Sequence, residues 1–469
     1  MRFDEYRAHD AIGLAELVAK KAVTPGELLN TALARMAEVN PKINAVTRDM
    51  SDLARANPPA GSGPLAGAPY LLKDLGAAYG GVPTTYGSKM FAEVVPAADS
   101  AITRLYKAAG LNIFGKTNTP EFGLWPVTEP DLLGPARNPW DLSRTPGGSS
   151  GGASAAVSAG IVPAAHASDG GGSIRIPAAC CGLFGMKPSR GRVSFSPAGE
   201  GWAGASIQHA VTRSVRDSAA LLDAVCAPQP GDPYFLAPPE RPFLEEAGRD
   251  PGKLRIAFSD KALTPGAKID PEVAEAVREA ARLCESLGHT VEEADLPGDH
   301  AAMQAAARTA IWASIAANVE AEADRRGRPL QPGELEAGTL DVYQRGKQTL
   351  GSDYVRAVQT IHAYGRAAAS LFERYDVFLC ATLGQPAIPI GWLFEDPAKV
   401  VERLFAYMPN TQAFNNSGQP AMSVPLAWSA SGLPIGIQFV TPTGDEATLF
   451  RLAGQLEKAR PWFDRIAPL

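Results

Sequence analysis

The chain has 469 residues, of which 45% are hydrophobic and 20% charged, so its composition is that of a globular protein able to bury a large core. Its formal net charge is -6 and no run of five basic residues occurs, which argues against a nucleic-acid partner. Five cysteines without a C-x-x-C pair argue against a disulfide framework and a zinc site, and no metal or cofactor is expected.

The first ten residues, MRFDEYRAHD, are charged from the second residue and lack the apolar stretch of a signal peptide. The blandest stretch, 152–167, is too short and too weakly apolar to span a membrane. We therefore expect a cytoplasmic protein without a membrane partner.

Helices and strands are expected to alternate along the chain. Residues 12–38 have helical periodicity, and Thr24-Pro25-Gly26-Glu27 in their middle forms a capping box that begins a second helix. The apolar run 66–72 is typical of a buried strand and ends at Lys73-Asp74. Further helices are expected at 100–110, 150–159, 301–326 and 353–374, and further strands at 111–114, 161–167, 254–258, 377–380, 422–426 and 435–440.

This alternation indicates an α/β fold in which helices flank both faces of a central mixed, largely parallel sheet. No repeat and no linker divides the chain, so residues 1–469 are expected to form a single domain. We expect a core at about 66–215 that holds the polar motifs, and a helical region at about 297–375. The long helices of that region could form a cap over a substrate site or the surface of a homodimer.

Two glycine–serine motifs flank one predicted helix–strand unit. The first is GGSSGG at 147–152, and the second is SDGGGSIR at 168–175. A serine hydroxyl is a weak nucleophile and needs a base. Lysine can be that base when burial lowers its pKa, because desolvation penalises the charged form. Lys73, at the end of an apolar strand, is therefore a candidate base.

The second motif also offers candidate hydrogen-bond donors. Consecutive glycines before a nucleophile let several backbone N–H groups point at one position, which is how an oxyanion hole forms. Gly170, Gly171 and Gly172, followed by Ser173, are the candidates for such a hole.

These motifs resemble the core of the amidase signature family. The likeness also includes GKTNTPE at 115–121, RNPW at 137–140, NSGQPA at 416–421 and GLPIG at 432–436, so it extends from about residue 10 to about residue 460. It implies the amidase-signature fold and hydrolysis of a carbon–nitrogen amide bond through an acyl-enzyme. The implied Ser-cisSer-Lys triad is Ser173 as nucleophile, Ser149 as proton relay after a cis Gly148–Ser149 peptide, and Lys73 as base.

Within that family, YLLKDL, GKTNTPE, RNPW, GRPL and NNSGQPA are similar to the 6-aminohexanoate-cyclic-dimer hydrolases, although the helix around Trp312 lacks the cysteine of that subgroup. The resemblance implies a small-molecule amide substrate. Aminohexanoate oligomers, aryl amides and carbamates are alternatives, the last of which would make the protein a urethanase.

Other residues near the motifs are candidates for supporting roles. Asp169 and Arg175 could pair and hold the glycine loop, or form a surface ion pair, and Ser150 could support the relay. Candidates for lining a substrate pocket are Trp125, Thr128 and Asn415.

Three other functions compete with this interpretation. Residues 147–151 also fit G-x-S-x-G, the nucleophile elbow of α/β-hydrolases, but the elbow follows a strand, whereas 137–146 is typical of a loop. The chain could instead be the glutaminase subunit of a tRNA-dependent amidotransferase, which has the same triad and works with a partner chain. A binding protein with a decayed core is the third alternative, but all three triad residues are intact.

Overall fold

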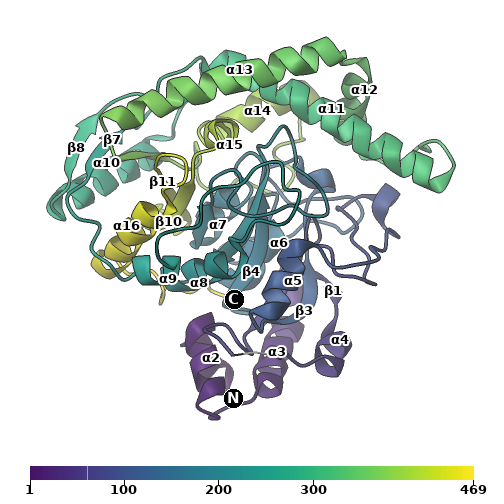
Figure 1. Ribbon diagram of the computed structural model, residues 1–469, viewed down its shortest axis with the longest axis vertical. Coiled ribbons are helices and arrows are strands. Elements are labelled where there is room, and N and C mark those ends of the chain that lie inside the picture. Colours follow the sequence, from purple (N-terminus) through teal and green to yellow (C-terminus); the bar gives the residue numbers. More distant parts are fainter. Residues whose placement is uncertain (61) are drawn as a thin grey trace.

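A single sheet runs through the computed structural model, which describes residues 1–60 and 62–469. In these residues, eleven strands follow the order β1-β3-β2-β4-β6-β5-β10-β11-β9-β7-β8 (Figure 1). The strands are β1 Val46–Asp49, β2 Pro69–Lys73, β3 Asn112–Thr117, β4 Ala164–Asp169, β5 Phe184–Lys187, β6 Ile207–Thr212, β7 Arg255–Phe258, β8 Thr290–Glu293, β9 Val377–Ala381, β10 Ala421–Trp428 and β11 Pro434–Val440.

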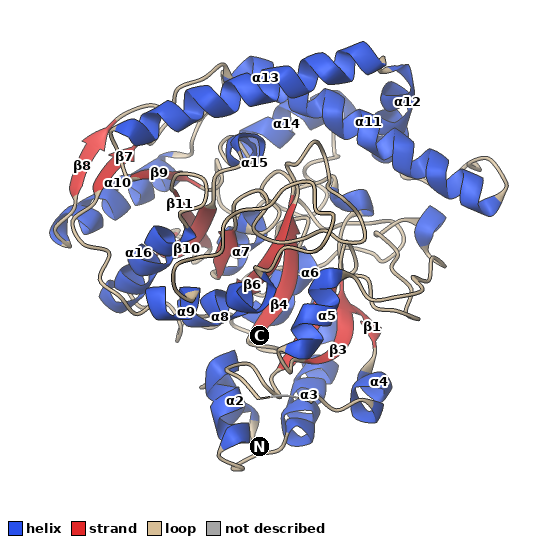
Figure 2. Ribbon diagram, in the orientation of Figure 1, coloured by secondary structure: helices blue, strands red, loops and turns tan. Residues whose placement is uncertain are grey.

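Helices cover both faces of this sheet, which confirms the predicted α/β class (Figure 2). The helices are α1 Phe3–Arg7, α2 Ala11–Ala19, α3 Pro25–Ile43, α4 Ser51–Ala56, α5 Ala101–Ala108, α6 Gly151–Ser158, α7 Arg175–Cys181, α8 Val215–Val225, α9 Phe243–Glu246, α10 Pro271–Ser286, α11 His300–Arg326, α12 Ala337–Gln348, α13 Gly351–Ala369, α14 Val400–Tyr407, α15 Gln412–Ser417 and α16 Glu446–Ala459.

The sheet is mixed, as predicted, but the expectation that it is largely parallel is wrong. Among the described strands, the parallel pairs are β2–β3, β2–β4, β7–β8 and β7–β9, and the other six pairs are antiparallel. Parallel neighbours need a crossover connection, whereas β10 and β11 are joined by a short turn and pair antiparallel.

The alternation of side chains along β2 decides where its last residue points. Tyr70 and Leu72 pack into the core shared with α5 and α8, and Leu71 packs into the core shared with α3, α6 and α7. Because successive side chains of a strand point to opposite faces, Lys73 lies on the α6 face, as Leu71 does. The alternation of side chains along β2 thus places Lys73 beside the start of α6.

The helical region expected at 297–375 is present as α11, α12 and α13, which arch over one end of the molecule (Figure 1). The N-terminus lies at the opposite end, beside α2 and α3, and the C-terminus lies between it and the sheet in this view (Figure 1). Across the described residues, no helix is long and apolar enough to cross a membrane.

Candidate active site

The polar motifs meet where two parallel strands end and two helices begin. β2 and β4 are parallel neighbours, with Leu71 opposite Ala165, so their carboxyl ends bring Lys73 and Asp169 to one edge of the sheet. The GGSSGG motif ends in α6, and the SDGGGSIR motif ends at Arg175, the first residue of α7. Strand ends and helix starts of this kind form the usual ligand-binding edge of α/β sheets.

Lys73 is buried among three serine hydroxyls. Its Nζ lies 2.7 Å from Ser149 Oγ and 3.0 Å from both Ser150 Oγ and Ser168 Oγ. Burial lowers the pKa of Lys73 to about 7, although the negative charge of Asp169 acts in the opposite direction. At neutral pH a large fraction of this lysine is therefore the free amine, which can accept a proton.

His166 supports Lys73 from the neighbouring strand. Its Nδ1 accepts a hydrogen bond of 3.2 Å from the backbone N–H of Lys73, so the ring proton lies on Nε2, which faces Gln208 Oε1 at 3.2 Å. Burial and the nearby Lys73 lower the pKa of His166 to about 3, so this ring stays neutral. His166 therefore fixes the backbone of Lys73 without adding a charge to the site.

Ser149 follows a cis peptide bond with Gly148, as the family resemblance implied. In residues 137–150 the structure has isolated bridges but no strand, so the context of a nucleophile elbow is missing. Within the described chain, none of the six histidines forms a hydrogen bond with Ser149. The elbow alternative therefore lacks both its strand and its base.

Ser173 lies between the glycine run and α7 and is 9% exposed. Its carbonyl accepts a hydrogen bond of 3.3 Å from the backbone N–H of Ser150, which joins the two serine motifs. In the part of the chain that the structure describes, the Ser173 hydroxyl forms no hydrogen bond with Ser149 or Lys73.

A fully buried ion pair holds the glycine loop. Arg175 donates through Nε and one terminal nitrogen to the two carboxylate oxygens of Asp169, at 3.0 Å each. Burial by itself would raise the pKa of Asp169, but the Arg175 guanidinium holds it well below its usual value. The same carboxylate accepts hydrogen bonds from the backbone N–H groups of Gly172 and Ile174. Asp169 therefore fixes the loop on both sides of Ser173.

These contacts change the predicted oxyanion hole. The N–H of Gly172 donates to Asp169 Oδ1 at 2.6 Å, so it is occupied inside the loop. The N–H groups of Gly170, Gly171 and Ser173 have no acceptor among the described residues. In this structure the Gly172 amide is bonded within the loop, and the amides of Gly170, Gly171 and Ser173 are the ones free to face a ligand.

Gly172 must be a glycine because its backbone conformation and its close neighbours leave no room for a side chain. Its φ is +136°, and an added Cβ would collide with Thr411 Oγ1 and lie 2.6 Å from Ile176 Cδ1. We expect Gly172→Ala to lower the free energy of unfolding by about 2 kcal/mol or more and to abolish hydrolysis. Gly171→Ala is the control, because its Cβ would meet nothing closer than 3.6 Å. Equal urea midpoints for the two variants would contradict this expectation.

Arg175 is the second position where we expect a large loss of stability. Arg175→Met would leave the buried Asp169 carboxylate without its countercharge, which costs about 3–5 kcal/mol of unfolding free energy. The exposed pair Arg356–Asp353 provides the control, and Arg356→Met is expected to change stability by less than about 1 kcal/mol. Urea denaturation of both variants measures the difference, and similar losses would show that the buried pair is not the main support of the loop.

A cavity of about 440 Å³ opens beside Ser149, Ser168 and Gly170. One wall is an aromatic cluster, in which the ring centroids of Tyr86 and Phe91 are 5.3 Å apart and those of Phe91 and Phe122 are 5.2 Å apart. The remaining lining includes Leu75, Trp202, and, from α11, Ile315, Asn318, Glu322 and Arg325. Glu322 is paired with Arg325 and Arg326. Polar side chains such as Glu200 share the lining, but most of the surface of the cavity is apolar.

The three residues predicted to line a pocket do not line this cavity in the described structure. Thr128 is buried and donates to the carbonyl of Gly147 at 2.9 Å, so it supports the first serine motif. Asn415 donates to Asp169 and Ala205 and accepts from Arg175, so it supports the glycine loop. Trp125 packs edge-on against Phe394, at 5.1 Å between centroids. Thr128 and Asn415 thus contact the two serine motifs, whereas the half-buried Trp125 packs outside this cavity.

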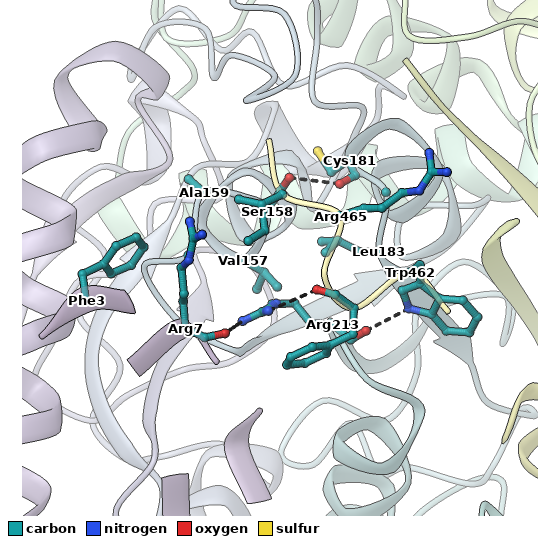
Figure 3. Close-up of a pocket in the computed structure, with 14 residues that line it drawn as sticks. Phe3, Arg7, Val157, Ser158, Ala159, Cys181, Leu183, Arg213, Trp462 and Arg465 are labelled. Atoms are coloured by element: carbon teal, nitrogen blue, oxygen red, sulfur yellow. Dashed lines mark hydrogen bonds between the residues drawn. The ribbon is translucent and has the colours of Figure 1, made fainter. Parts of the chain in front are cut away.

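A second hollow lies at the far ends of the same two helices. It contains Ser158 at the end of α6 and Cys181 at the end of α7, whereas Ser149 and Ser173 precede these helices. Figure 3 shows that its Arg213 is engaged by the carbonyl of Arg7 and that the Arg213 carbonyl accepts from Trp462. This hollow contains none of the predicted site residues.

Sequence reasoning missed Ser168 and the aromatic cluster. Ser168 lies in the second motif and could have been noticed because it is adjacent to Asp169. The aromatic side chains come from separate loops and no spacing connects them.

Together, these observations define an α/β protein with a buried lysine hydrogen-bonded to three serines beside a cavity. The family model described as Amidase matches residues 27–450. The 6-aminohexanoate-cyclic-dimer hydrolase of Paenarthrobacter ureafaciens is 38% identical over 472 residues, which cover 97% of this chain and 96% of that relative. The chain therefore belongs to the amidase signature family, and it is an amide-bond hydrolase.

Solved structures agree with this assignment. A structure of 6-aminohexanoate cyclic dimer hydrolase complexed with substrate has a TM-score of 0.95 and 36% identity, and the alignment covers 98% of both chains. A bacterial aryl acylamidase of the amidase signature family has a TM-score of 0.89 and 26% identity, covering 98% of this chain and 99% of that one.

Proposed function

We propose that the chain hydrolyses a small amide through an acyl-enzyme on Ser173, with Ser149 as relay and Lys73 as base. The carrying observation is the buried Lys73 Nζ at 2.7 Å from Ser149 Oγ. A neutral lysine has two N–H donors and one lone pair. Its two N–H groups would donate to Ser168 Oγ and Ser150 Oγ. The Ser150 hydroxyl donates its own proton to the Ser168 carbonyl. The lysine lone pair is then left to accept a proton from Ser149.

In the proposed reaction, Ser173 attacks the amide carbonyl and its proton passes through Ser149 to Lys73. The N–H groups of Gly170 and Gly171 stabilise the oxyanion, since preorganised donors in a water-poor site favour developing charge. The proton returns through Ser149 to the departing nitrogen, because an amine leaves poorly unless it is protonated. Water then releases the acid by the same relay.

We propose an apolar amide as substrate, with a cyclic or linear aminohexanoate amide, an aryl amide or a carbamate as the alternatives. The mostly apolar cavity of about 440 Å³ supports a substrate of this kind, because such groups gain from leaving water. The names of the aligned relatives, a cyclic-dimer hydrolase and an aryl acylamidase, point in the same direction.

A hydrolysis screen of the isolated chain tests this proposal. Cyclic and linear aminohexanoate oligomers, aryl amides, small carbamates and glutamine are the substrates to compare. We expect turnover of at least one apolar amide and little turnover of glutamine. Glutamine hydrolysis that depends on an added partner chain would instead favour the glutaminase subunit of a tRNA-dependent amidotransferase.

A further inference from the structure

The segment Glu200–Ser206 forms a small closed loop at the edge of the cavity. The Ser206 N–H donates to the Gly201 carbonyl at 3.0 Å, and the Ala205 N–H donates to the Trp202 carbonyl at 3.3 Å. Asn415 Nδ2 ties the loop to the core through the Ala205 carbonyl, at 3.0 Å. The loop is therefore held in one shape and is attached to the residue that also supports Asp169.

Two consecutive residues of this loop have left-handed backbone conformations. The φ angles of Trp202 and Ala203 are +58° and +56°. Side chains other than glycine rarely adopt such angles, and residues that do are concentrated at ligand sites. The loop therefore holds the backbone of Trp202 in a left-handed conformation that is unfavourable for a tryptophan.

This conformation places the indole ring directly on the glycine loop. A Cβ added to Gly170 would lie 2.6 Å from two carbons of the Trp202 ring, so only glycine permits this approach. Trp202, Gly170 and Ser149 all line the same cavity. The indole thus covers the backbone of the first residue of the glycine run, on the cavity side.

We propose that Trp202 limits the width of the cavity beside the reacting carbonyl. It thereby excludes acyl groups that are branched at the carbon bonded to that carbonyl. The inference rests on the proposed function, in which the carbonyl oxygen faces the N–H groups of Gly170 and Gly171. That position brings the adjacent acyl carbon close to the indole ring. An unbranched chain passes along the ring, whereas a branch meets it.

The test compares two isomeric substrates, the 4-nitroanilides of butyric and isobutyric acid. We expect the natural chain to prefer the linear isomer in kcat/KM by about tenfold or more, since one misplaced methyl group in a closed pocket is worth about 10- to 200-fold. Trp202→Ala is expected to raise the branched-to-linear ratio by about tenfold. Damage to the loop alone would lower both rates and leave the ratio unchanged, and that outcome overturns the proposal.

Two further variants sharpen the test. Introduced alone, Gly170→Ala is expected to displace the indole and to shift the branched-to-linear ratio of kcat/KM. Introduced together with Trp202→Ala, it is expected to shift that ratio much less. Trp428→Phe is the matched control, because this tryptophan lies on β10, outside the cavity, and its indole N–H meets no acceptor in the described chain. A ratio shift in the control equal to that of Trp202→Ala would overturn the proposal.

The proposed function fails in a different way. A natural chain that cleaves neither anilide, turns over no amide of the screen and is not labelled by a fluorophosphonate would overturn the acyl-enzyme itself. A natural chain that is active and prefers the linear isomer, with an unchanged ratio in Trp202→Ala, would overturn only the role of Trp202.

Discussion

Replacing Ser173 by alanine is expected to lower kcat by about 10⁴-fold or more, because no acyl-enzyme can then form and only binding and the oxyanion donors remain. Steady-state hydrolysis of the best amide from the screen measures the loss. Ser154→Ala is the matched control, since Ser154 is also buried, lies on α6 and makes no side-chain hydrogen bond in the described chain. We expect the control to keep its activity.

The position of a trapped acyl or phosphonyl group separates the two serine roles. Ser149 and Ser173 share the tryptic peptide 145–175, but Asp169 is the only acidic residue between them, so cleavage before Asp169 separates them. We expect the label on the fragment that carries Ser173. A label on Ser149 would contradict the proposed order of the triad.

The pH dependence of hydrolysis is the second large effect. Because Lys73 must be neutral to accept a proton, and burial lowers its pKa to about 7, kcat/KM is expected to rise with pH and level off above about 7. Below that value it should fall by about tenfold per pH unit, since the lysine becomes protonated. A profile that is flat between pH 5.5 and 8 would contradict the role of Lys73.

Two variants assign this profile to one residue. Lys73→Arg keeps a positive charge that cannot be removed, so we expect a loss of about 10³- to 10⁴-fold at every pH. Lys187 on β5 is also buried, and burial and the nearby Arg175 lower its pKa to about 7. Lys187→Met should therefore leave the midpoint of the profile unchanged. If the midpoint moves in this variant, the group that titrates in the pH profile is Lys187 and not Lys73.

Much of the sheet could be predicted from apolar runs, but the strand ends could not. The strands expected at 66–72, 111–114 and 161–167 begin later and extend further, to Lys73, Thr117 and Asp169. Periodicity treats a polar residue as the end of a strand. In the fold these polar residues are buried and hydrogen-bonded to groups from other segments, such as Ser149 for Lys73, Leu72 for Thr117 and Asn415 for Asp169, so the strands continue through them.

The centre of the site could be predicted because its chemistry is local in the sequence. In both serine motifs the glycines are adjacent to the serine in the sequence, and Asp169 and Arg175, which form an ion pair, are only six positions apart. The roles of Thr128, Asn415 and Gly172 could not be predicted, because they depend on which backbone group each one meets after folding. The left-handed loop around Trp202 gave no sequence signal for the same reason.

The support of the glycine loop has a consequence for synthesis of the chain. Arg175 donates to Gln438 Oε1 at 2.7 Å across 263 positions, and β10 and β11 lie in the middle of the sheet, between β5 and β9. At about 5–20 residues per second, residue 438 leaves the ribosome roughly 13 to 50 seconds after residue 175. A nascent chain therefore carries both serine motifs long before it has the side chains that order them, and hydrolytic activity should arise only when synthesis is almost finished.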